Sequence, residues 1–473
     1  MFTKYQILKL SFRSDINFLR AIAVLLVILY HLNIKFFNGG WLGVDIFFFI
    51  SGYLITNKIL NSIQSNSFSF YNFFKNRFQR LTPSLISLSL TTTFFSFIFL
   101  SSAELKTHID STFYSLVYVS NFFYSNFDFY NAPNNKYLTM LHTWSLSVEE
   151  QIYILLPIIL IFIYRRNKKF LVYGLISFFV CSLLLTIFSV SENIFYNTFS
   201  RVWEFFFGSL FMLFEKRIKE FGLKHSEIYG FTLILYSVIF VAGEDVNAII
   251  PKILVLIGTA LFMMECSEKR YITNKPIQVI GTISYSLYLF HQPVIAFLNI
   301  QNDKISELSN ISEILIIFSI FIISYLNWYF IENGLRKEKN FILVLCVYFI
   351  VIITFGLLVF DIPDENKFFN VPNKIFLLKI KQDDILTQNG RSCDNRALRD
   401  SCSFINSEES TTIYVLGDSS LRTLGAALVN DPLFNKYNKV QVTGNDCLFI
   451  FGKHPSANSC PNKSIEDKDN FGM

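Results

Sequence analysis

The chain has 473 residues, of which 52% are hydrophobic and only 16% are charged, and its mean hydropathy is +0.41. Soluble globular proteins carry about 25% charged residues, so this composition excludes an ordinary soluble protein and indicates a multi-span membrane protein with at most a modest soluble part. The net charge of +5 does not point to nucleic acid, because the basic residues fall in short clusters beside apolar runs.

Eleven apolar segments are candidates for membrane spans, since a span needs about 20 apolar residues. They lie near residues 16–34, 43–60, 83–100, 147–164, 170–188, 201–214, 228–243, 250–264, 279–297, 312–331 and 341–360. The segment 111–124 is ambiguous. We expect it to lie in the membrane interface rather than to cross, because an extra span here would break the alternation of the basic clusters that follow.

Those basic clusters predict the orientation of the chain. They comprise Lys75/Arg77/Arg80, Arg165/Arg166/Lys168/Lys169, Lys216/Arg217/Lys219, Lys269/Arg270 and Arg336/Lys337/Lys339. With the N-terminus inside and eleven spans, every cluster falls on the cytoplasmic side, as the positive-inside rule requires. The polar region 361–473 is then extracytoplasmic. It holds Cys393, Cys402, Cys447 and Cys460, which suggests disulfides whose pairing the sequence leaves open.

The first span contains the stretch RAIAVLLVILYH, which begins with Arg20 and ends with His31. Eleven residues make almost three helical turns, so the two side chains share one face, about 16 Å apart along the axis. A lone histidine in an apolar helix is more often structural than functional.

Ionisable side chains inside a bilayer are costly and are therefore candidates for function. The polar candidates other than Arg20 and His31 are Asp45, Ser51, Glu149, Glu150, Arg201, Glu204 and His291. Together with Arg20 and His31 they fall on five of the predicted spans, which fits a polar cavity open to the outside. Asp45 is level with His31, so it could orient the imidazole of a general base. The alternative is a set of buried ion pairs that only locks helices together.

A basic and aromatic segment, FSFYNFFKNRFQRLTPS, joins the second and third spans on the inner side. One interpretation is an amphipathic helix that contacts lipid headgroups. The other is an anion site for a phosphorylated cytoplasmic substrate, because the forked donors of Arg77 and Arg80 suit phosphate. Spacing alone does not separate the two interpretations.

Six stretches, in order from about residue 11 to 335, resemble the membrane acyltransferase family 3. They read SDINFLRAIAVLLVILYH, GGWLGVDIFFFISGYLIT, FFKNRFQRLTPS, LHTWSLSVEEQIYILLP, RVWEFFFGSL and ISYSLYLFHQP. The branch is similar to bacterial O-acetyltransferases that modify lipopolysaccharide O-antigen and other surface glycans. The resemblance implies an all-α polytopic protein with a ten-helix acyltransferase domain (11–335), an eleventh tether helix (336–360) and an SGNH-type extracytoplasmic domain (361–473).

The resemblance also implies a reaction, in which an acyl group, usually acetyl from cytoplasmic acetyl-CoA, moves to a sugar hydroxyl outside. Arg20 and His31 match a family motif, and Arg77 and Arg80 match its basic motif. We expect these arginines to engage the phosphates of CoA. His31 would act as general base or briefly carry the acyl group, and Asp45 would support it. Glu149 is a further catalytic candidate in the cavity. Ser51, Ser147, Glu150 and His291 would line the cavity.

The stretch TIYVLGDSSLRTLGAALV predicts a strand, a tight turn and a helix in the external region. Gly417, Asp418 and Ser419 match the first block of the SGNH hydrolases, in which the serine is the nucleophile. Only His454 follows, without an aspartate three residues before it, and about 110 residues are few for such a domain. We therefore expect a partial α/β domain without a catalytic base, and Ser419 stays a candidate nucleophile.

Two further hypotheses remain open at this point. The buried His, Asp and Arg residues could form the path of a glycan or anion transporter, although such proteins often show inverted repeats, which this sequence lacks. The chain could also be a sensor that binds acyl-CoA without turnover. The scattered histidines do not have the spacing of a zinc site, and we expect no metal and no permanently bound cofactor. The predicted location is a bacterial inner membrane, in contact with lipid.

Overall fold

A computed structural model describes residues 13–361 and five strand segments between residues 387 and 444. Between residues 13 and 361, the stretches that are not described are 128–136, 168–169, 190–191, 242–247, 265–268, 270, 303–309 and 337–339. The chain divides into two units, residues 1–366 and 367–473, and each is described by itself.

The first unit consists of helices. Their bounds are α1 (Ser14–His31), η1 (Gly40–Leu42), α2 (Gly43–Gln64), α3 (Phe70–Phe99), α4 (Ser102–Leu116), α5 (Ser120–Ser125), α6 (Thr143–Arg166), α7 (Phe170–Phe188), η3 (Glu192–Tyr196), α8 (Thr198–Glu220), α9 (Ser226–Tyr236), η4 (Ser237–Val241), α10 (Ile249–Met264), α11 (Lys275–Thr282), α12 (Ser284–Asn302), α13 (Asn310–Asn327), η5 (Trp328–Glu332), α14 (Asn333–Leu335) and α15 (Phe341–Asp361). Each predicted span overlaps helical residues of the described structure.

Within the described residues, seven helical segments are long and apolar enough to cross a membrane. They are Ser14–His31, Gly40–Gln64, Phe70–Phe99, Thr143–Arg166, Phe170–Phe188, Leu315–Leu335 and Phe341–Val359. Two more apolar segments, Ser226–Phe240 and Ile249–Met264, are shorter. The chain is therefore a multi-span helical membrane protein, and the complete set of eleven spans stays a prediction.

The ambiguous segment 111–124 is not one continuous helix. It is divided between α4, of 15 residues, and α5, of six, with Tyr118 between them in the left-handed region at φ 57°. α4 packs against α3 and α15, whereas α5 packs against α6. The segment therefore lacks a continuous helix of spanning length.

The basic segment after α2 is not a separate helix. α3 runs without interruption for 30 residues, from Phe70 through the internal Pro83 to Phe99. Ser69 caps its first turn by accepting a hydrogen bond from the backbone N–H of Asn72. Arg77 and Arg80 thus lie on the N-terminal part of a long, apolar helix, so the basic segment and the third predicted span form one helix.

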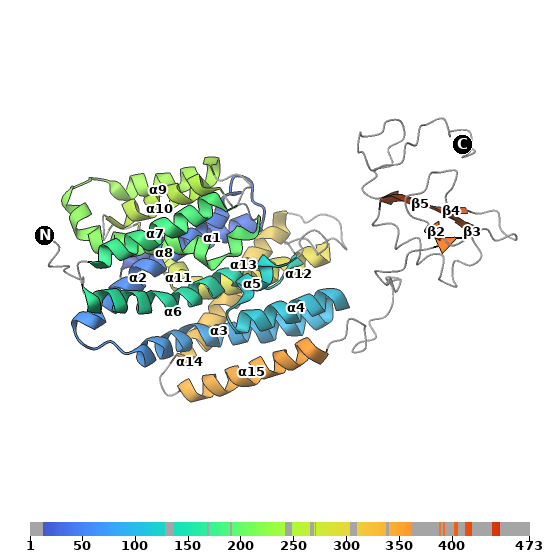
Figure 1. The fold of residues 1–473 in the computed structure, drawn as a ribbon, viewed down its shortest axis with the longest axis horizontal. Helices are drawn as coiled ribbons and strands as arrows, with labels where there is room; N and C mark the ends of the chain where they lie inside the picture. The colour runs from blue at the N-terminus through green and yellow to red at the C-terminus, as the bar shows by residue number, and fades with distance from the viewer. Residues whose placement is uncertain are drawn as a thin grey trace. The chain divides into compact units, whose positions relative to one another are not determined.

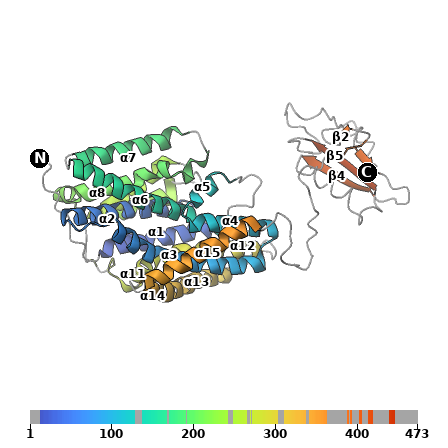
Figure 2. The same cartoon turned by 60° about the horizontal axis from the view of Figure 1, so that its bottom comes forward.

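Glycines allow α2 and α8 to lie in direct backbone contact. A Cβ at Gly52 would lie 2.0 Å from the carbonyl oxygen of Phe205, and one at Gly208 would lie 2.0 Å from that of Phe49. Small residues at helix interfaces permit such close approach in membranes. α7 covers the other side of α8, and α9 pairs with α10 (Figures 1 and 2). This packing fixes the position of Ser51, the neighbour of Gly52.

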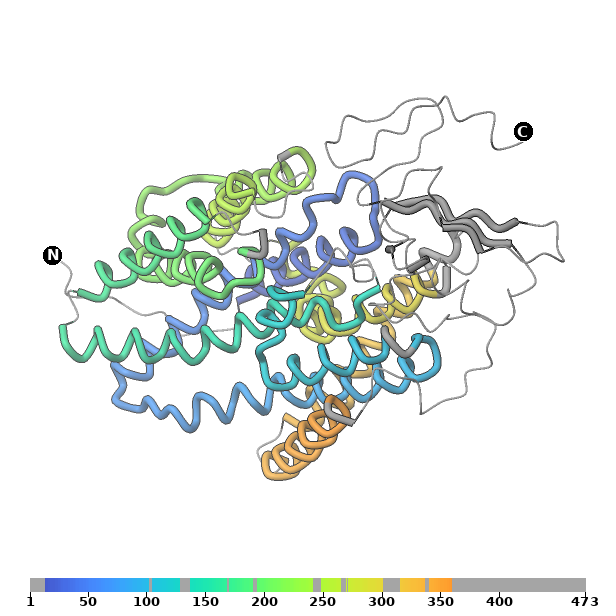
Figure 3. The backbone as a smooth tube through the Cα atoms, turned by 45° about the vertical axis from the view of Figure 1, so that its right-hand side comes forward, coloured from blue at the N-terminus to red at the C-terminus, as the bar shows by residue number. Residues whose placement is uncertain are grey.

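A second group of helices completes the unit. α12 packs against α1, α3 and α13, and α15 lies along α3 and α4 at the edge of the bundle (Figure 3). The hydroxyl of Tyr348 on α15 donates to the carbonyl of Leu116 on α4, at 2.6 Å. The α1 helix, which carries Arg20 and His31, therefore contacts helices of both groups.

The second unit contains two small sheets. β1 (Thr387–Gln388) pairs antiparallel with β2 (Arg391–Ser392). In the other sheet the order is β3-β5-β4, with β3 (Cys402–Phe404) antiparallel and β4 (Thr412–Asp418) parallel to β5 (Asn438–Gly444). The predicted strand at 412–418 is thus present. Ser419, and Cys393, Cys447 and Cys460 with their predicted disulfides, lie outside the described residues.

Candidate active site

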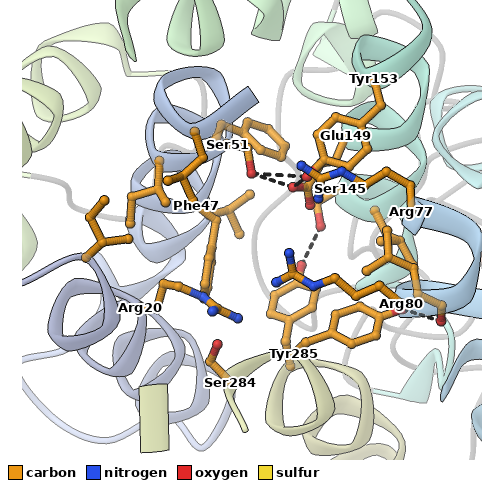
Figure 4. A pocket seen from close by; sticks show the side chains of 18 of the residues that line it. Arg20, Phe47, Ser51, Arg77, Arg80, Ser145, Glu149, Tyr153, Ser284 and Tyr285 are labelled. Atoms are coloured by element: carbon orange, nitrogen blue, oxygen red, sulfur yellow. Dashed lines mark hydrogen bonds between the residues drawn. The ribbon is translucent and has the colours of Figure 1, made fainter. Parts of the chain in front are cut away.

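A pocket of about 290 Å³ lies between helices α1, α2, α3, α6 and α12 (Figure 4). Its polar and aromatic lining comes from all five helices, and comprises Arg20, Ser51, Arg77, Arg80, Ser145, Glu149, Tyr153, Ser284, Tyr285 and Tyr288, with Arg13 and Asn17. Five of the residues proposed from sequence therefore meet in one cavity, although they are spread over almost 130 positions of the chain.

Arg20, Arg77 and Arg80 are the dominant charges of this pocket. Arg20 approaches from α1, and its guanidinium faces that of Arg80 across the cavity in Figure 4. Within the described residues, none of the three guanidinium groups has a carboxylate oxygen within 4.0 Å. Three like charges held together without ion pairs favour an anion, and the forked donors of arginine match phosphate oxygens.

The remaining charges of the pocket do not neutralise the three arginines. Arg13 also lines the cavity, but it is already paired with Asp15 at 2.6 Å and with Glu215 at 3.3 Å. Glu149 is the only acidic side chain among the lining residues. The pocket therefore keeps a positive excess, which a bound anion would offset.

Glu149 has two hydroxyl partners. Ser51 from α2 and Tyr153 from the next turn of α6 both donate hydrogen bonds to its Oε1 atom. The Tyr153 ring also lies under Arg77, with 4.1 Å between the guanidinium carbon and the ring centroid. Such a cation–π contact orients the guanidinium without consuming its hydrogen-bond donors. The cluster thus joins α2, α3 and α6 on one wall of the pocket.

His31 does not line the pocket but stands beside a second histidine. Its ring centroid lies 5.0 Å from that of His291 on α12. The Nδ1 atom of His31 is 2.9 Å from the carbonyl of Val27, and that of His291 is 2.6 Å from the carbonyl of Tyr288. A carbonyl can only accept, so both rings carry hydrogen on Nδ1 and, when neutral, present the lone pair of Nε2. His31 is only partly buried.

Tyr288 connects the pocket with the histidines. It lines the pocket, and its ring centroid lies 5.4 Å from that of His291 and 5.6 Å from that of His142. Its hydroxyl bonds to the Ser145 hydroxyl at 2.6 Å and donates to the carbonyl of His142 at 3.1 Å. The arginine pocket and the histidine cluster (His31, His142 and His291) are therefore contiguous.

Comparison with known proteins identifies the family. A model described as an acyltransferase domain matches residues 13–361, which include both the pocket and the histidine cluster. The chain belongs to this acyltransferase family. No solved structure gives a significant match to it.

Several curated proteins are similar to this acyltransferase chain. O-acetyltransferase OatA of Staphylococcus aureus is 30% identical over 346 residues, which are 68% of the chain and 56% of that protein. The protein named peptidoglycan O-acetyltransferase OatA of Listeria monocytogenes is 30% identical over 352 residues, with the same two shares. A putative O-acetyltransferase of S. aureus, SAS0844, is 29% identical over 363 residues. The chain spans little more than half the length of these relatives.

Asp45 lies elsewhere in the acyltransferase domain than the sequence suggested. Its carboxylate pairs with Arg201 at 3.0 Å, and Arg201 lies 3.2 Å from Glu204. All three side chains are buried between α2 and α8. The guanidinium also lies over the rings of Phe48, Trp144 and Phe195. The structure thus places Asp45 in an interhelical ion-pair cluster and records no contact with His31, so the predicted support of His31 is not observed.

Two other predicted cavity residues do not reach the pocket. The Ser147 hydroxyl lies 2.8 Å from that of Ser120 and accepts from the backbone N–H of Ser120 at 3.1 Å. Ser147 therefore ties α5 to α6. Glu150 points away from Glu149 around the same helix, and its buried Oε1 atom has no hydrogen-bond partner in the described structure. Helical geometry explains both outcomes, because Glu150 is rotated by about 100° and Ser147 by about 200° from Glu149 around the axis of α6.

Three residues of the site were missed by the sequence analysis, namely His142, Tyr153 and Tyr288. A signal existed for Tyr153, which follows Glu149 by four residues and so shares its helix face. His142 precedes α6 and no periodicity marks it.

Both ring nitrogens of His142 and Nε2 of His291 are buried without a hydrogen-bond partner in the described structure, which costs about 1–3 kcal/mol per unpaired group. Within the same residues, no group of three or more His, Cys, Asp or Glu is placed to hold a metal ion.

Proposed function

We propose that the chain is an integral membrane O-acetyltransferase that moves an acetyl group from cytoplasmic acetyl-CoA to a hydroxyl of a cell-surface glycan. The observation that carries the proposal is the pocket that Arg20, Arg77 and Arg80 line together, where no carboxylate oxygen of the described residues lies within 4.0 Å of their guanidinium groups. The phosphates of CoA supply the anionic charge that this pocket lacks. Membership of the acyltransferase family and the names of the relatives support the reaction type.

The arginine pocket would bind the donor, and His31 would face the acceptor. Arg20 and His31 lie on one face of α1, about 16 Å apart. That separation would let Arg20 hold donor phosphates while His31 works farther along the helix. Tyr288 lies between the two regions, in contact with His291 and on the wall of the pocket.

The transfer would proceed by general base catalysis at His31. Its Nε2 atom takes the proton of the acceptor hydroxyl, whose oxygen attacks the thioester carbonyl carbon. The new C–O bond forms, the C–S bond breaks, and the CoA thiolate takes up the proton that His31 received. Glu149 would keep Arg77 in place through Tyr153 and so would act on the donor side.

The acceptor belongs to the cell envelope in this proposal. The Listeria relative is named for peptidoglycan, whereas the sequence resemblance favoured lipopolysaccharide O-antigen, and both are glycans with free hydroxyls. The N-terminus would be cytoplasmic, and residues 361–473 would form an SGNH-like extracytoplasmic domain. Ser419 is the residue after β4 in the sequence, and the resemblance makes it the candidate nucleophile of this domain. It would pass the acyl group on or assist in binding the glycan.

The test uses the full chain in liposomes of a bacterial lipid mixture, with radiolabelled acetyl-CoA inside and a glycan outside. Soluble peptidoglycan fragments and O-antigen oligosaccharide are offered in separate samples. We expect label on one of the glycans with the wild-type protein and none with His31→Ala. Empty liposomes and the folded His31→Ala variant are the controls.

Other outcomes would change the assignment. Transfer that survives His31→Ala would remove the general-base role and keep the enzyme. Release of acetate and CoA without label on any glycan would indicate an acyltransferase domain that lacks its outer partner domain. If no thioester is consumed but a glycan or an anion crosses the membrane, the transporter hypothesis replaces this one.

A further inference from the structure

His142 is a buried titratable side chain that the proposed reaction does not use. It immediately precedes α6, and its residue is only 3% exposed. Its ring centroid lies 5.5 Å from that of His291, which in turn lies 5.0 Å from that of His31. His142 and the proposed general base His31 are therefore both neighbours of His291.

The nitrogen atoms of this cluster indicate an occupant. Among the described residues, both ring nitrogens of His142 and Nε2 of His291 are buried without a hydrogen bond of good geometry, and the backbone of Leu289 is at most a weak partner of the His142 ring. Buried side-chain nitrogens are normally bonded. His108 shows what a structural histidine looks like in the same bundle. Its Nε2 lies 2.9 Å from the hydroxyl of Thr93, and its Nδ1 lies 2.7 Å from that of Thr139.

The unpartnered hydrogen-bond donor and acceptors of the cluster are ones that a hydroxyl group can satisfy. A neutral His142 offers one donor and one acceptor, and His291, with hydrogen on Nδ1, offers an acceptor at Nε2. A hydroxyl likewise donates once and accepts twice. An anion does not fit as well, because the unpaired arginines lie in the adjoining pocket, where Tyr288 separates them from the histidines.

We propose that His142, together with His291, binds a second hydroxyl of the acceptor sugar, next to the one that His31 deprotonates. The inference rests on the proposed function, because it assumes that His31 faces the acceptor. His142 would thereby orient the sugar and decide which of its hydroxyls reaches His31. It is a binding residue of the acceptor and is not required for binding acetyl-CoA.

A mutant–analogue cycle tests this assignment in the full chain. The probes are methyl N-acetyl-β-glucosaminide and its three monodeoxy analogues, given as acceptors with acetyl-CoA as donor. In the wild type, one analogue should retain the acylated position but show about a tenfold higher KM, because it lacks the hydroxyl that His142 binds. With His142→Ala the parent sugar should show the same rise, and that analogue should lose nothing further.

Matched variants separate binding from folding. His142→Gln, which retains a donor and an acceptor, should recover part of the affinity for the parent sugar. His108→Gln, in the histidine that threonines already satisfy, should leave both KM values unchanged. The KM for acetyl-CoA should be the same in all folded variants, as size-exclusion profiles in detergent would verify.

The contrary results are distinct. A folded His142→Ala protein that retains the wild-type KM for the parent sugar would overturn the inference. So would a KM that rises equally for the parent and for every deoxy analogue, since that indicates a structural role alone. A wild type that consumes thioester but discriminates none of the analogues overturns the inference and keeps the proposed function. A wild type that consumes no thioester overturns both.

Discussion

The guanidinium of Arg77 rests on the ring of Tyr153, with 4.1 Å between the guanidinium carbon and the ring centroid. The same tyrosine donates its hydroxyl hydrogen to Glu149. One side chain of α6 therefore restrains an arginine of α3 through its ring and a carboxylate of its own helix through its hydroxyl.

Two substitutions at Tyr153 should separate these contacts. Tyr153→Phe removes the hydrogen bond to Glu149 and keeps the ring, whereas Tyr153→Leu removes both. A cation–π contact of this kind contributes about 1 kcal/mol. The KM for acetyl-CoA should therefore rise about fivefold more in the leucine variant than in the phenylalanine variant. Equal KM values in steady-state thioester assays would show that the ring does not hold Arg77 for the donor.

Arg80 should matter for donor binding and for its dependence on salt. Removal of one charge-assisted contact costs about 1.5–3 kcal/mol, so Arg80→Ala should weaken CoA binding about ten- to hundredfold. The variant should also respond less to ionic strength, because one screened charge is gone. Calorimetric titration in detergent at low and high salt measures both effects. Arg217→Ala, in the last turn of α8 and not among the residues that line the pocket, is the control and should bind CoA normally.

Asp45 should prove to be a stabilising residue. Breaking a fully buried ion pair costs about 3–5 kcal/mol, so Asp45→Asn should lower the thermal midpoint of the purified protein strongly. Asp110→Asn disturbs a partly exposed pair with Lys106 and should cost less than about 1 kcal/mol. If Asp45→Asn instead leaves the midpoint intact and abolishes turnover, a role in orienting His31 regains support.

The contact between α2 and α8 should be intolerant of a single methyl group. In Gly52→Ala the new Cβ would lie 2.0 Å from the carbonyl oxygen of Phe205, and the helices must separate. Overpacking costs about 1–3 kcal/mol or more, and Ser51 would shift away from Glu149 with its helix. Gly334→Ala is the matched control, since the nearest atom to its Cβ is 3.8 Å away. Thermal midpoints and thioester turnover of both variants, measured side by side, would decide; equal midpoints would refute the tight contact.

Much of the helix pattern follows from the sequence. Apolar length and the placement of basic residues predicted a helix at each of the eleven segments, because a bilayer allows the backbone few other solutions. The periodicity of α1 also placed Arg20 and His31 on one face. The predicted start of the third span, near Pro83, was less accurate, because the apolar pattern marks the hydrophobic part of α3 and not its polar first turns.

The partners of the polar residues needed the tertiary structure. Depth in the membrane made Asp45 look level with His31, but depth fixes only one coordinate, and the rotation of α2 against α8 directs its carboxylate to Arg201. The same limit applies to Ser147, which faces Ser120. Conversely, His142 lies outside any helical periodicity, and only the packing of α12 against the start of α6 brings it to His291.

The sequence by itself thus determined where most of the long helices lie and which polar residue types the membrane domain carries. Both depend on properties local to a segment, namely apolar length, charge and helical period. The tertiary structure decided that Arg20, Arg77 and Arg80 share a pocket and that three histidines adjoin it. Those arrangements depend on how each helix is rotated about its axis, which is set by contacts between distant segments, such as the glycine contact of α2 with α8.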